Sequence, residues 1–412
     1  MNASPSEAPR IRSSSTPYRV CVRCVMDTSD DRIEFDANGI CSHCHEGDQD
    51  LAKLPTEAEG ESRLAPLVER IKAAGAGHEY DAIIGLSGGV DSSYGALLAH
   101  RHGIRALAVH FDNGWNSELA VENIQRIVEA TGFDLLTYVI DWPEFRDLQR
   151  SFLKASVIDI EMITDHAILA ALVRLATEQK IKYILSGTNH ATEHGMPHHW
   201  VWSKADWTNI KDIHDRFGSV PLKTYPHLTR RRWLAMHGLN RGPQIVEPLE
   251  HVHYRRDLAV TTLEREIGWR DYGGKHHESV FTRFYQSWIL PRKFGVDKRL
   301  VHLSARIRNH EITREEAEQA LERPLYPSAE ALATEREFVL KKLGFTEQEF
   351  DAIMADPPKP HSAYRSDQPF QRLVERAYRP VRGIRSIGAG GMVLLGAGAV
   401  LLAWVGIVLL SG

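Results

Sequence analysis

A glycine- and serine-rich segment is the part of the chain best suited to chemistry. Residues 87–93 read SGGVDSS and follow an apolar run, 82–86, with the length and β-branched content of a buried strand. Glycines let a backbone approach phosphate oxygens, and the N–H groups of the turn and of the following helix bind anions. We therefore predict a phosphate-binding loop. In it, Ser87, Gly88, Gly89 and Ser92 are the candidates for binding phosphate, and Asp91 is the candidate for holding Mg²⁺.

This loop differs from the commonest phosphate-binding motifs. It lacks the lysine and spacing of G-x-x-x-x-G-K-[ST], and it is not G-x-G-x-x-G. It resembles the S-G-G-x-D-S PP-loop of the ATP pyrophosphatase superfamily, which includes NAD synthetase, GMP synthetase and tRNA-modifying enzymes. The resemblance implies ATP cleavage between the α- and β-phosphates, with AMP transferred to a substrate oxygen while the loop holds the pyrophosphate.

Alternating strands and helices are expected to position the loop. Apolar runs predict strands at 82–86, 104–111, 134–140 and 181–186, and helices at 92–102, 117–131 and 155–179. This βαβ pattern predicts an α/β fold with a doubly wound parallel sheet. Ligands bind beyond the carboxyl ends of such strands. As in relatives of the superfamily, we expect the nucleotide to contact His110, Asp112, Gly187 and Thr188.

All four cysteines lie in one short region. Cys21 and Cys24 form one C-x2-C pair, and Cys41 and Cys44 form a second pair sixteen residues later. This spacing is typical of a Zn²⁺ site with four thiolates, which leave no open position and so favour a structural role. A disulfide pair and an iron–sulfur cluster are the alternatives.

A narrower resemblance extends over roughly residues 20–326. Residues 186–193 (SGTNHATE) are followed by 210–214 (IKDIH), 222–226 (LKTYP), 273–276 (GGKH), 281–284 (FTRF) and 297–299 (DKR). With the paired cysteines, this series resembles the N-acetyl sugar amidotransferase family of surface-glycan biosynthesis. The resemblance implies conversion of a sugar acetamido group to an acetamidino group, with ammonia from a separate glutaminase.

Several residues of these motifs are candidates for the reaction. Lys223 or the pair Lys298 and Arg299 could bind phosphate or a sugar carboxylate. Glu193, Lys275 and Arg283 are further candidates for binding the sugar. Covalent activation by ATP suits this chemistry, because an amide oxygen is a poor leaving group until it is adenylated.

The predicted organisation has six parts. They are a disordered leader (1–17), a zinc ribbon (18–50), the ATP-binding α/β domain (51–255), a helical subdomain (256–356), a linker (357–385) and a tail (386–412). The tail has no charged side chain and follows four regularly spaced arginines, so it predicts a single transmembrane helix with the enzyme on the cytoplasmic face.

Two other function classes share some of these features. A tRNA-modifying PP-loop enzyme could share the paired cysteines, but a net charge of −4 does not favour RNA, and we expect no nucleic acid partner. A non-enzymatic, membrane-tethered scaffold would have no need of an intact S-G-G-x-D-S loop. Neither the sugar, the glutaminase nor the oligomeric state follows from the sequence.

Overall fold

The computed structural model describes residues 17–237, 242–273 and 278–374. Residues 1–366 form one compact unit and 367–412 a second, and the account below concerns the first. Three predictions fall outside the described residues: Lys275, the transmembrane tail and residues 1–16 of the leader. Within the described ranges, no helix combines the length and apolarity needed to cross a membrane.

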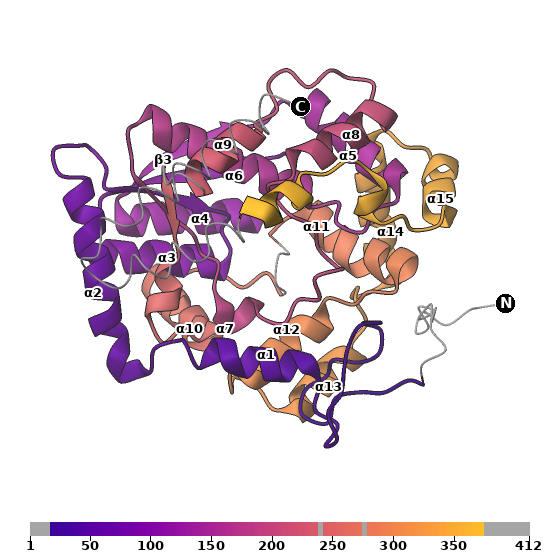
Figure 1. Cartoon of the computed structure of the whole chain (residues 1–412), viewed down its shortest axis with the longest axis horizontal. Coiled ribbons are helices and arrows are strands. Elements are labelled where there is room, and N and C mark those ends of the chain that lie inside the picture. Colours follow the sequence, from indigo (N-terminus) through magenta and orange to yellow (C-terminus); the bar gives the residue numbers. More distant parts are fainter. Residues whose placement is uncertain (1–16, 238–241, 274–277, 375–412) are drawn as a thin grey trace. The chain divides into compact units, whose positions relative to one another are not determined.

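A five-stranded parallel sheet carries the fold (Figure 1). Its strands are β1 (Ala82–Leu86), β2 (Ala106–Asp112), β3 (Asp134–Val139), β4 (Tyr183–Leu185) and β5 (Gln244–Val246). The strand order is β3-β2-β1-β4-β5, so the chain builds the sheet outward from β1 in one direction and then, with β4, in the other. Open α/β sheets bind ligands at this switch point between β1 and β4. The predicted parallel sheet is confirmed, and β5 was missed because three residues carry too little pattern.

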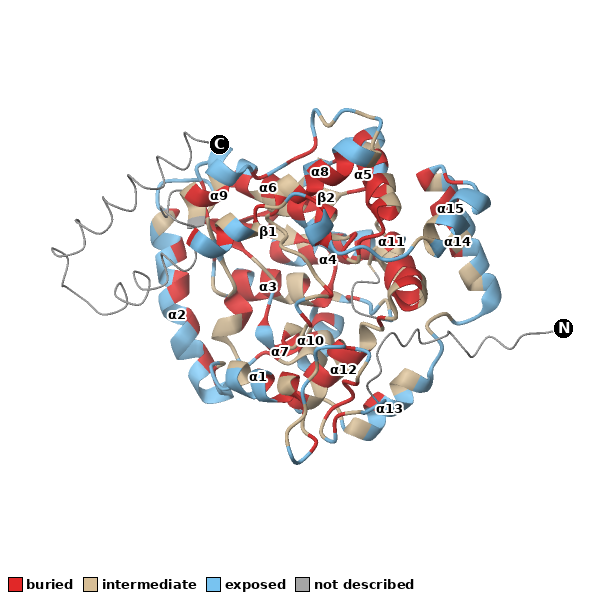
Figure 2. Ribbon diagram, turned by 45° about the vertical axis from the view of Figure 1, so that its right-hand side comes forward, coloured by how far each residue is buried: buried red, intermediate tan, exposed pale blue. Residues whose placement is uncertain are grey.

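Helices cover both faces of the sheet. On one side lie α3 (Val90–Arg101) and α4 (Glu118–Thr131), and on the other lies α6 (Met162–Glu178) (Figure 2). Buried side chains are concentrated in this layer, whereas α2 (Glu57–Ala74) has one face exposed to solvent. The loop after β1 therefore lies between β1 and α3, two elements whose positions are fixed by packing.

The predicted single helix over 155–179 is wrong. The chain forms α5 (Trp142–Ala155), then turns at Ser156, whose φ of 57° is left-handed, before α6 begins at Met162. Asp141 caps α5 by accepting the backbone N–H of Glu144 at 3.0 Å. The prediction missed this start because the buried face of α5 includes the acidic Glu144 and Asp147.

The C-terminal part of the unit is helical, as predicted. It contains α10 (Arg256–Ile267), α11 (Val280–Phe284), the π-helix η2 (Tyr285–Phe294), α12 (Arg299–Arg308), α13 (Arg314–Glu322), α14 (Ala329–Leu343) and α15 (Glu347–Ala355). The shift from α11 into π-helical hydrogen bonding precedes Pro291, which has no N–H to donate. His361 and Tyr364, within the predicted linker, are buried side chains of the compact unit.

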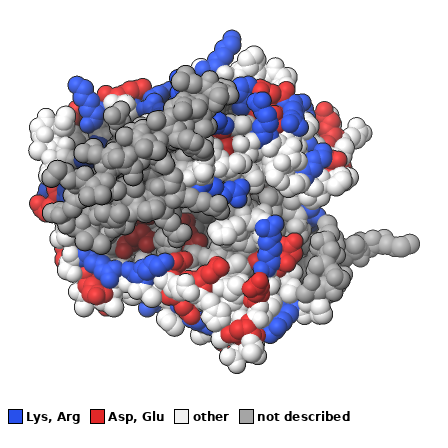
Figure 3. Space-filling view, viewed as in Figure 1, with Lys and Arg blue, Asp and Glu red and all other residues white. Residues whose placement is uncertain are grey.

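Shorter elements complete the unit. They are α1 (Ser42–Leu51), α7 (His190–Glu193), α8 (Trp207–Phe217), α9 (Arg230–His237) and the 3₁₀ turns η1 (Pro248–His251) and η3 (His361–Ala363). α1 lies beside α7 and α12 (Figure 1). On the face shown in Figure 3, acidic and basic side chains of the described residues are interspersed.

Candidate functional site

The predicted PP-loop is a tight turn between β1 and α3. Gly88 has a φ of +81°, and a Cβ there would lie 2.4 Å from the carbonyl oxygen of Ala120. Ser87 accepts the N–H of Gly89 at 3.2 Å, and its hydroxyl lies 3.2 Å from that of Ser92. The two hydroxyls and the free end of α3 thus gather around one small space, as a phosphate site requires.

The segment before α11 closes one side of the loop. Trp269 donates its indole N–H to the carbonyl of Gly88 at 2.9 Å. A Cβ built on Gly89 would lie 3.0 Å from the Tyr272 hydroxyl and 3.5 Å from a carboxylate oxygen of Glu278. Burial, and then the negative charges of Glu278 and Asp91, raise the pKa of Tyr272 well above its usual range. Asp91 and Glu278 therefore both lie close to Tyr272, and their oxygens are the hard ligands that Mg²⁺ prefers.

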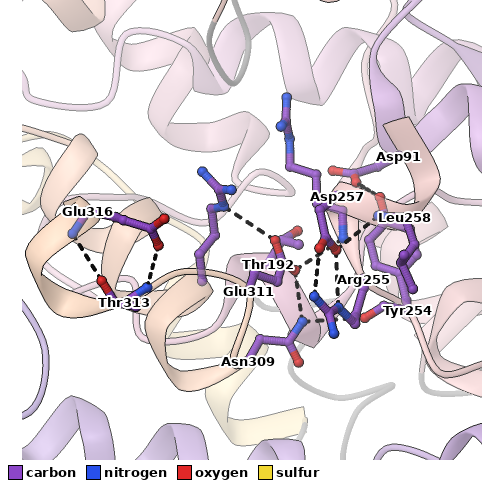
Figure 4. Close-up of polar contacts among 12 residues, drawn as sticks. Asp91, Thr192, Tyr254, Arg255, Asp257, Leu258, Asn309, Glu311, Thr313 and Glu316 are labelled. Carbon is purple, nitrogen blue, oxygen red and sulfur yellow. Dashed lines mark hydrogen bonds and ion pairs between the residues drawn. The ribbon is translucent and has the colours of Figure 1, made fainter. Parts of the chain in front are cut away.

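Asp91 is held by a residue that lies far from it in the sequence. The buried Tyr254 donates its hydroxyl hydrogen to Oδ1 of Asp91 (Figure 4). Burial, and then the charge of Asp91, raise the pKa of Tyr254 well above its usual range, so the phenol stays a donor. This contact orients the carboxylate that we predict to hold Mg²⁺.

The strand ends beside the loop differ in how free their side chains are. His110 is buried, with Nδ1 3.1 Å from the carbonyl of Leu86 and Nε2 3.0 Å from the Asn116 amide nitrogen. Asp112 accepts the N–H of Gly114 at 2.8 Å and the Asn116 amide at 3.2 Å. Both side chains therefore hold the loop after β2 in shape. The backbone of this loop and the second carboxylate oxygen of Asp112 remain for contacts with a nucleotide.

The end of β4 touches the PP-loop helix directly. A Cβ on Gly187 would lie 2.9 Å from the backbone nitrogen of Ser92 and from the carbonyl carbon of Asp91, so only glycine fits this approach. Thr188 is exposed next to it, with its hydroxyl accepting from Ser186 at 2.9 Å. The structure thus brings the first and fourth strand ends together, as predicted for one nucleotide site.

A basic cavity of about 410 Å³ adjoins this site. Asp271 and Gly273 line it, and Tyr272 between them reaches the PP-loop. Its charged lining is mostly positive, with Arg256, Lys298, Arg299, Arg306 and Arg323 against Asp271 and Asp297. An anionic group is therefore the ligand that this cavity suits best.

Two predicted residues lie in the cavity wall. Lys298 is mostly buried, at 13% side-chain exposure, and its ammonium lies 3.9 Å from a carboxylate oxygen of Glu161. Arg299 pairs with Asp297 at 2.7 Å and donates to the carbonyl of Arg323 at 2.7 Å. Lys298 can turn toward a ligand because its ion pair with Glu161 is long, whereas the short contacts of Arg299 fix that side chain in the cavity wall.

A buried carboxylate, not predicted, holds two of the residues that line the cavity. Glu311 accepts the backbone N–H of Arg256 at 3.1 Å, the Asn309 amide at 2.9 Å and Nε of Arg306 at 3.3 Å (Figure 4). Its side chain is fully buried. Glu311, in the turn between α12 and α13, thereby fixes two arginines that line the cavity. This turn contains no sequence motif, so no signal in the sequence pointed to it.

Three other predicted residues lie outside the cavity lining. Lys223 is exposed, and the backbone N–H groups of residues 223–225 bind the buried Glu144 carboxylate. Burial opposes ionisation of Glu144, but those N–H donors lower its pKa. Arg283 pairs with Glu335, a structural ion pair within the helical region. Glu193 ends α7, next to the cavity residue Thr192.

Two short backbone pairings join the loop after β2 to the segment before α11. Asn116 and Ser279 form an antiparallel bridge. Ser117 donates to the carbonyl of Glu278 at 2.8 Å, and Val280 donates to that of Trp115 at 2.8 Å. Backbone hydrogen bonds therefore tie the loop after β2 to a segment from the C-terminal region.

The four cysteines form a buried cluster of free thiols. Their Sγ atoms lie within 4.8 Å of one another, and the Cys21–Cys44 and Cys24–Cys41 separations are 3.9 and 3.7 Å. The backbone N–H groups of Arg23, Cys24 and Cys41 point at the sulfur of Cys21 at 3.3–3.5 Å. Buried sulfurs with N–H donors suit thiolates around one Zn²⁺ ion, and the predicted disulfide alternative does not hold.

Two family models match parts of the chain. Residues 278–378 match "LPS biosynthesis protein WbpG-like, C-terminal domain", and residues 81–198 match "Queuosine biosynthesis protein QueC". These matches confirm the predicted resemblance, and they support an ATP-dependent enzyme of the ligase type. No curated protein matches the chain.

Solved structures that resemble the chain include two synthetases. One is an NH3-dependent NAD synthetase from Campylobacter jejuni, at 14% identity and a TM-score of 0.27, covering 38% of this chain and 72% of its own. The other is NMN synthetase from Francisella tularensis, at 14% identity and a TM-score of 0.34, covering 73% of this chain and 98% of its own.

Proposed function

We propose that this chain, which joins a PP-loop domain to a WbpG-like C-terminal domain, is an ATP-dependent amidotransferase acting on an N-acetylated, acidic sugar. The acetamido oxygen attacks the α-phosphorus of ATP and pyrophosphate leaves. Ammonia then adds at the amide carbon, and AMP departs with the original oxygen. The product is an acetamidino sugar, as expected in surface-glycan biosynthesis.

One observation carries this proposal. The PP-loop and the basic cavity share a wall, because Asp271 and Gly273 line the cavity while Tyr272 between them reaches Gly89. A molecule that places an anionic group near Lys298 can thus extend an uncharged amide toward the α-phosphate. Adenylation needs this proximity more than it needs a nucleophilic side chain.

The residues around the loop have separate tasks. Ser87, Ser92 and the N–H groups of the turn bind the leaving pyrophosphate, where negative charge develops. Asp91 and Glu278 would hold Mg²⁺, which neutralises phosphate charge when it is bound. Tyr254 and Tyr272 keep the site lined by neutral donors, and Lys298 orients the acidic sugar.

The nitrogen source is proposed to be a separate glutaminase. The sequence contains no cysteine outside the cluster at 21–44, so no thiol is available for glutamine hydrolysis by a cysteine nucleophile. We also propose that the tail over 386–412 holds the enzyme at the cytoplasmic face of a membrane.

The test is a direct assay of the exchange. Purified protein is incubated with ATP, Mg²⁺, ¹⁵N-ammonium and a panel of acidic and neutral N-acetyl sugars, and the products are analysed by mass spectrometry. We expect an acetamidino product containing ¹⁵N, with AMP and pyrophosphate in equal amounts. ADP and orthophosphate as main products, or AMP formed with tRNA as the only acceptor, would overturn the proposal.

A further inference from the structure

A single buried arginine joins the cysteine cluster to the loop beside the PP-loop. Arg308, on α12, is 1% exposed. Its Nη1 lies 3.8 Å from Sγ of Cys24 and 3.9 Å from Sγ of Cys44. Its Nε donates to Nε2 of His194 at 2.7 Å. We infer that Arg308 is a positioning residue which couples metal occupancy of the cysteine cluster to the geometry of the ATP site.

Charge explains why the arginine needs the metal centre. Four thiolates around one Zn²⁺ carry a net charge of −2, and this charge is buried with the sulfurs. The positive charge of the guanidinium neutralises one of these two negative charges. The metal centre in turn supplies the negative partner that a buried cation requires. Without the metal centre, the guanidinium loses this buried partner, and its position between the sulfurs and His194 is no longer favoured.

Steric fit shows that this position is built rather than incidental. A Cβ on Gly195 would lie 2.6 Å from Nη2 of Arg308, and a Cβ on Gly47 would lie 2.9 Å from its Nε and 2.7 Å from the His194 ring. The two glycines come from different segments, one in α1 and one after α7. Because neither glycine has a side chain, the two leave a slot between them that the side chains of Arg308 and His194 fill.

The path from this slot to the ATP site is short. Nδ1 of His194 lies 2.5 Å from the carbonyl of His190, the first residue of α7. Asn189 caps α7 by accepting the N–H of Thr192 at 2.9 Å. Two residues earlier, Gly187 lies against Asp91 and Ser92 of the PP-loop. Displacing Arg308 therefore moves α7 and, through it, the loop that presses on the pyrophosphate site.

The experiment compares zinc-loaded and zinc-stripped protein with two readouts. Binding of an ATP analogue with a methylene bridge between the α- and β-phosphorus is measured by calorimetry, and hydrogen exchange is measured over residues 186–199. Removing zinc should weaken analogue binding about tenfold, within the usual range for coupling between sites, and should speed exchange over this segment. Unchanged exchange in protein shown to have lost zinc would overturn the inference.

Variants separate coupling from folding. Arg308→Met at saturating zinc should behave like stripped wild-type protein, and Arg308→Lys should recover part of the affinity. The matched control is Arg314→Met, because Arg314 donates to the carbonyl of Val22 in the same cysteine region at 3.1 Å. It should keep wild-type binding and exchange.

A second variant covers the case in which Arg308→Met fails to hold zinc. His194→Leu leaves the arginine at the sulfurs and breaks only the joint with α7, so we expect full zinc content with weakened analogue binding. Wild-type affinity and exchange in zinc-loaded His194→Leu would overturn the inference. The nucleotide readout rests on the proposed function, whereas the exchange readout does not. Wild-type protein that binds no analogue would thus count against the proposed function alone.

Discussion

The Tyr254 hydroxyl donates a hydrogen bond to Oδ1 of Asp91, a residue 163 positions earlier in the chain. Tyr254→Phe removes this donor and so weakens the contact that orients the carboxylate. We expect the Mg²⁺ concentration for half-maximal ATP turnover to rise several-fold, while unfolding free energy falls by about 1 kcal/mol, as for one lost hydrogen bond. Initial rates over a Mg²⁺ titration and urea unfolding are the measurements.

Asp91→Asn provides the comparison for that variant. It keeps the side-chain volume but removes the charge, so ATP turnover should be lost at every Mg²⁺ concentration. If Asp91→Asn kept its turnover, Asp91 would not hold the metal, and the effect of Tyr254→Phe would need another cause.

Gly88→Ala should disable the PP-loop. Its Cβ would lie 2.4 Å from the Ala120 carbonyl oxygen, at a φ of +81°. We expect loss of ATP binding, measured by calorimetry. Gly132→Ala is the matched control, because Gly132 is also left-handed, with a φ of +66°, but has open space around it. It should cost only about 1–2 kcal/mol of stability and leave ATP affinity unchanged. Equal ATP binding in both variants would contradict the assignment.

Lys298 and Lys223 were equal candidates from sequence, and the structure separates them. Lys298→Met should raise the KM for the acidic sugar about tenfold or more, since a hydrogen bond to a charged group contributes about 1.5–3 kcal/mol. The KM for ATP should stay the same. Lys223→Met removes an exposed ammonium outside the cavity lining and should change neither constant. Steady-state kinetics with each substrate varied in turn would show the reverse pattern if the cavity were not the sugar site.

Acid should destabilise the fold through a buried histidine. Burial lowers the pKa of His166 from 6.5 to about 4. Its Nε2 accepts the N–H of Leu228 at 3.0 Å, so protonation would lose that acceptor. Because the folded pKa is lowered, the unfolded state binds more protons between pH 6.5 and 4. Stability is therefore full above pH 6.5 and falls as the pH drops toward 4, by roughly 3 kcal/mol for about 2.5 pKa units.

Urea unfolding of His166→Gln at several pH values measures this contribution. The variant should be less stable than wild type at pH 7.5 and should lose less stability on acidification. An identical pH slope in both proteins would show that His166 does not titrate in this window.

Local patterns predicted the parts of the fold that are set locally. The strand 82–86 matches β1, and the spacing of Cys21, Cys24, Cys41 and Cys44 matches the buried sulfur cluster. The start of α5 could not be found in this way. Its buried carboxylates at Glu144 and Asp147 are satisfied by backbone N–H groups at 219–225, more than seventy residues later.

The same limit applied to the site. The S-G-G-x-D-S motif located the PP-loop, and the end of the strand predicted at 181–186 located Gly187 beside it, because parallel strands end at the same edge of a sheet. Tyr254, Trp269 and Glu311 carry no motif, and their roles come from contacts with residues far away in the chain. Arg283 fits a motif but forms an ion pair with Glu335, which only the folded chain reveals.

The bridge between Asn116 and Ser279 has a consequence for recombining such proteins. It lies between the segments matched by the two family models, with one partner in each. A chimera that joins this nucleotide domain to a foreign C-terminal region must therefore supply matching backbone partners at 278–280. Without them, the loop after β2 loses two hydrogen bonds and the edge beside the nucleotide is left open. A chimera should therefore keep the two matched segments together as one unit.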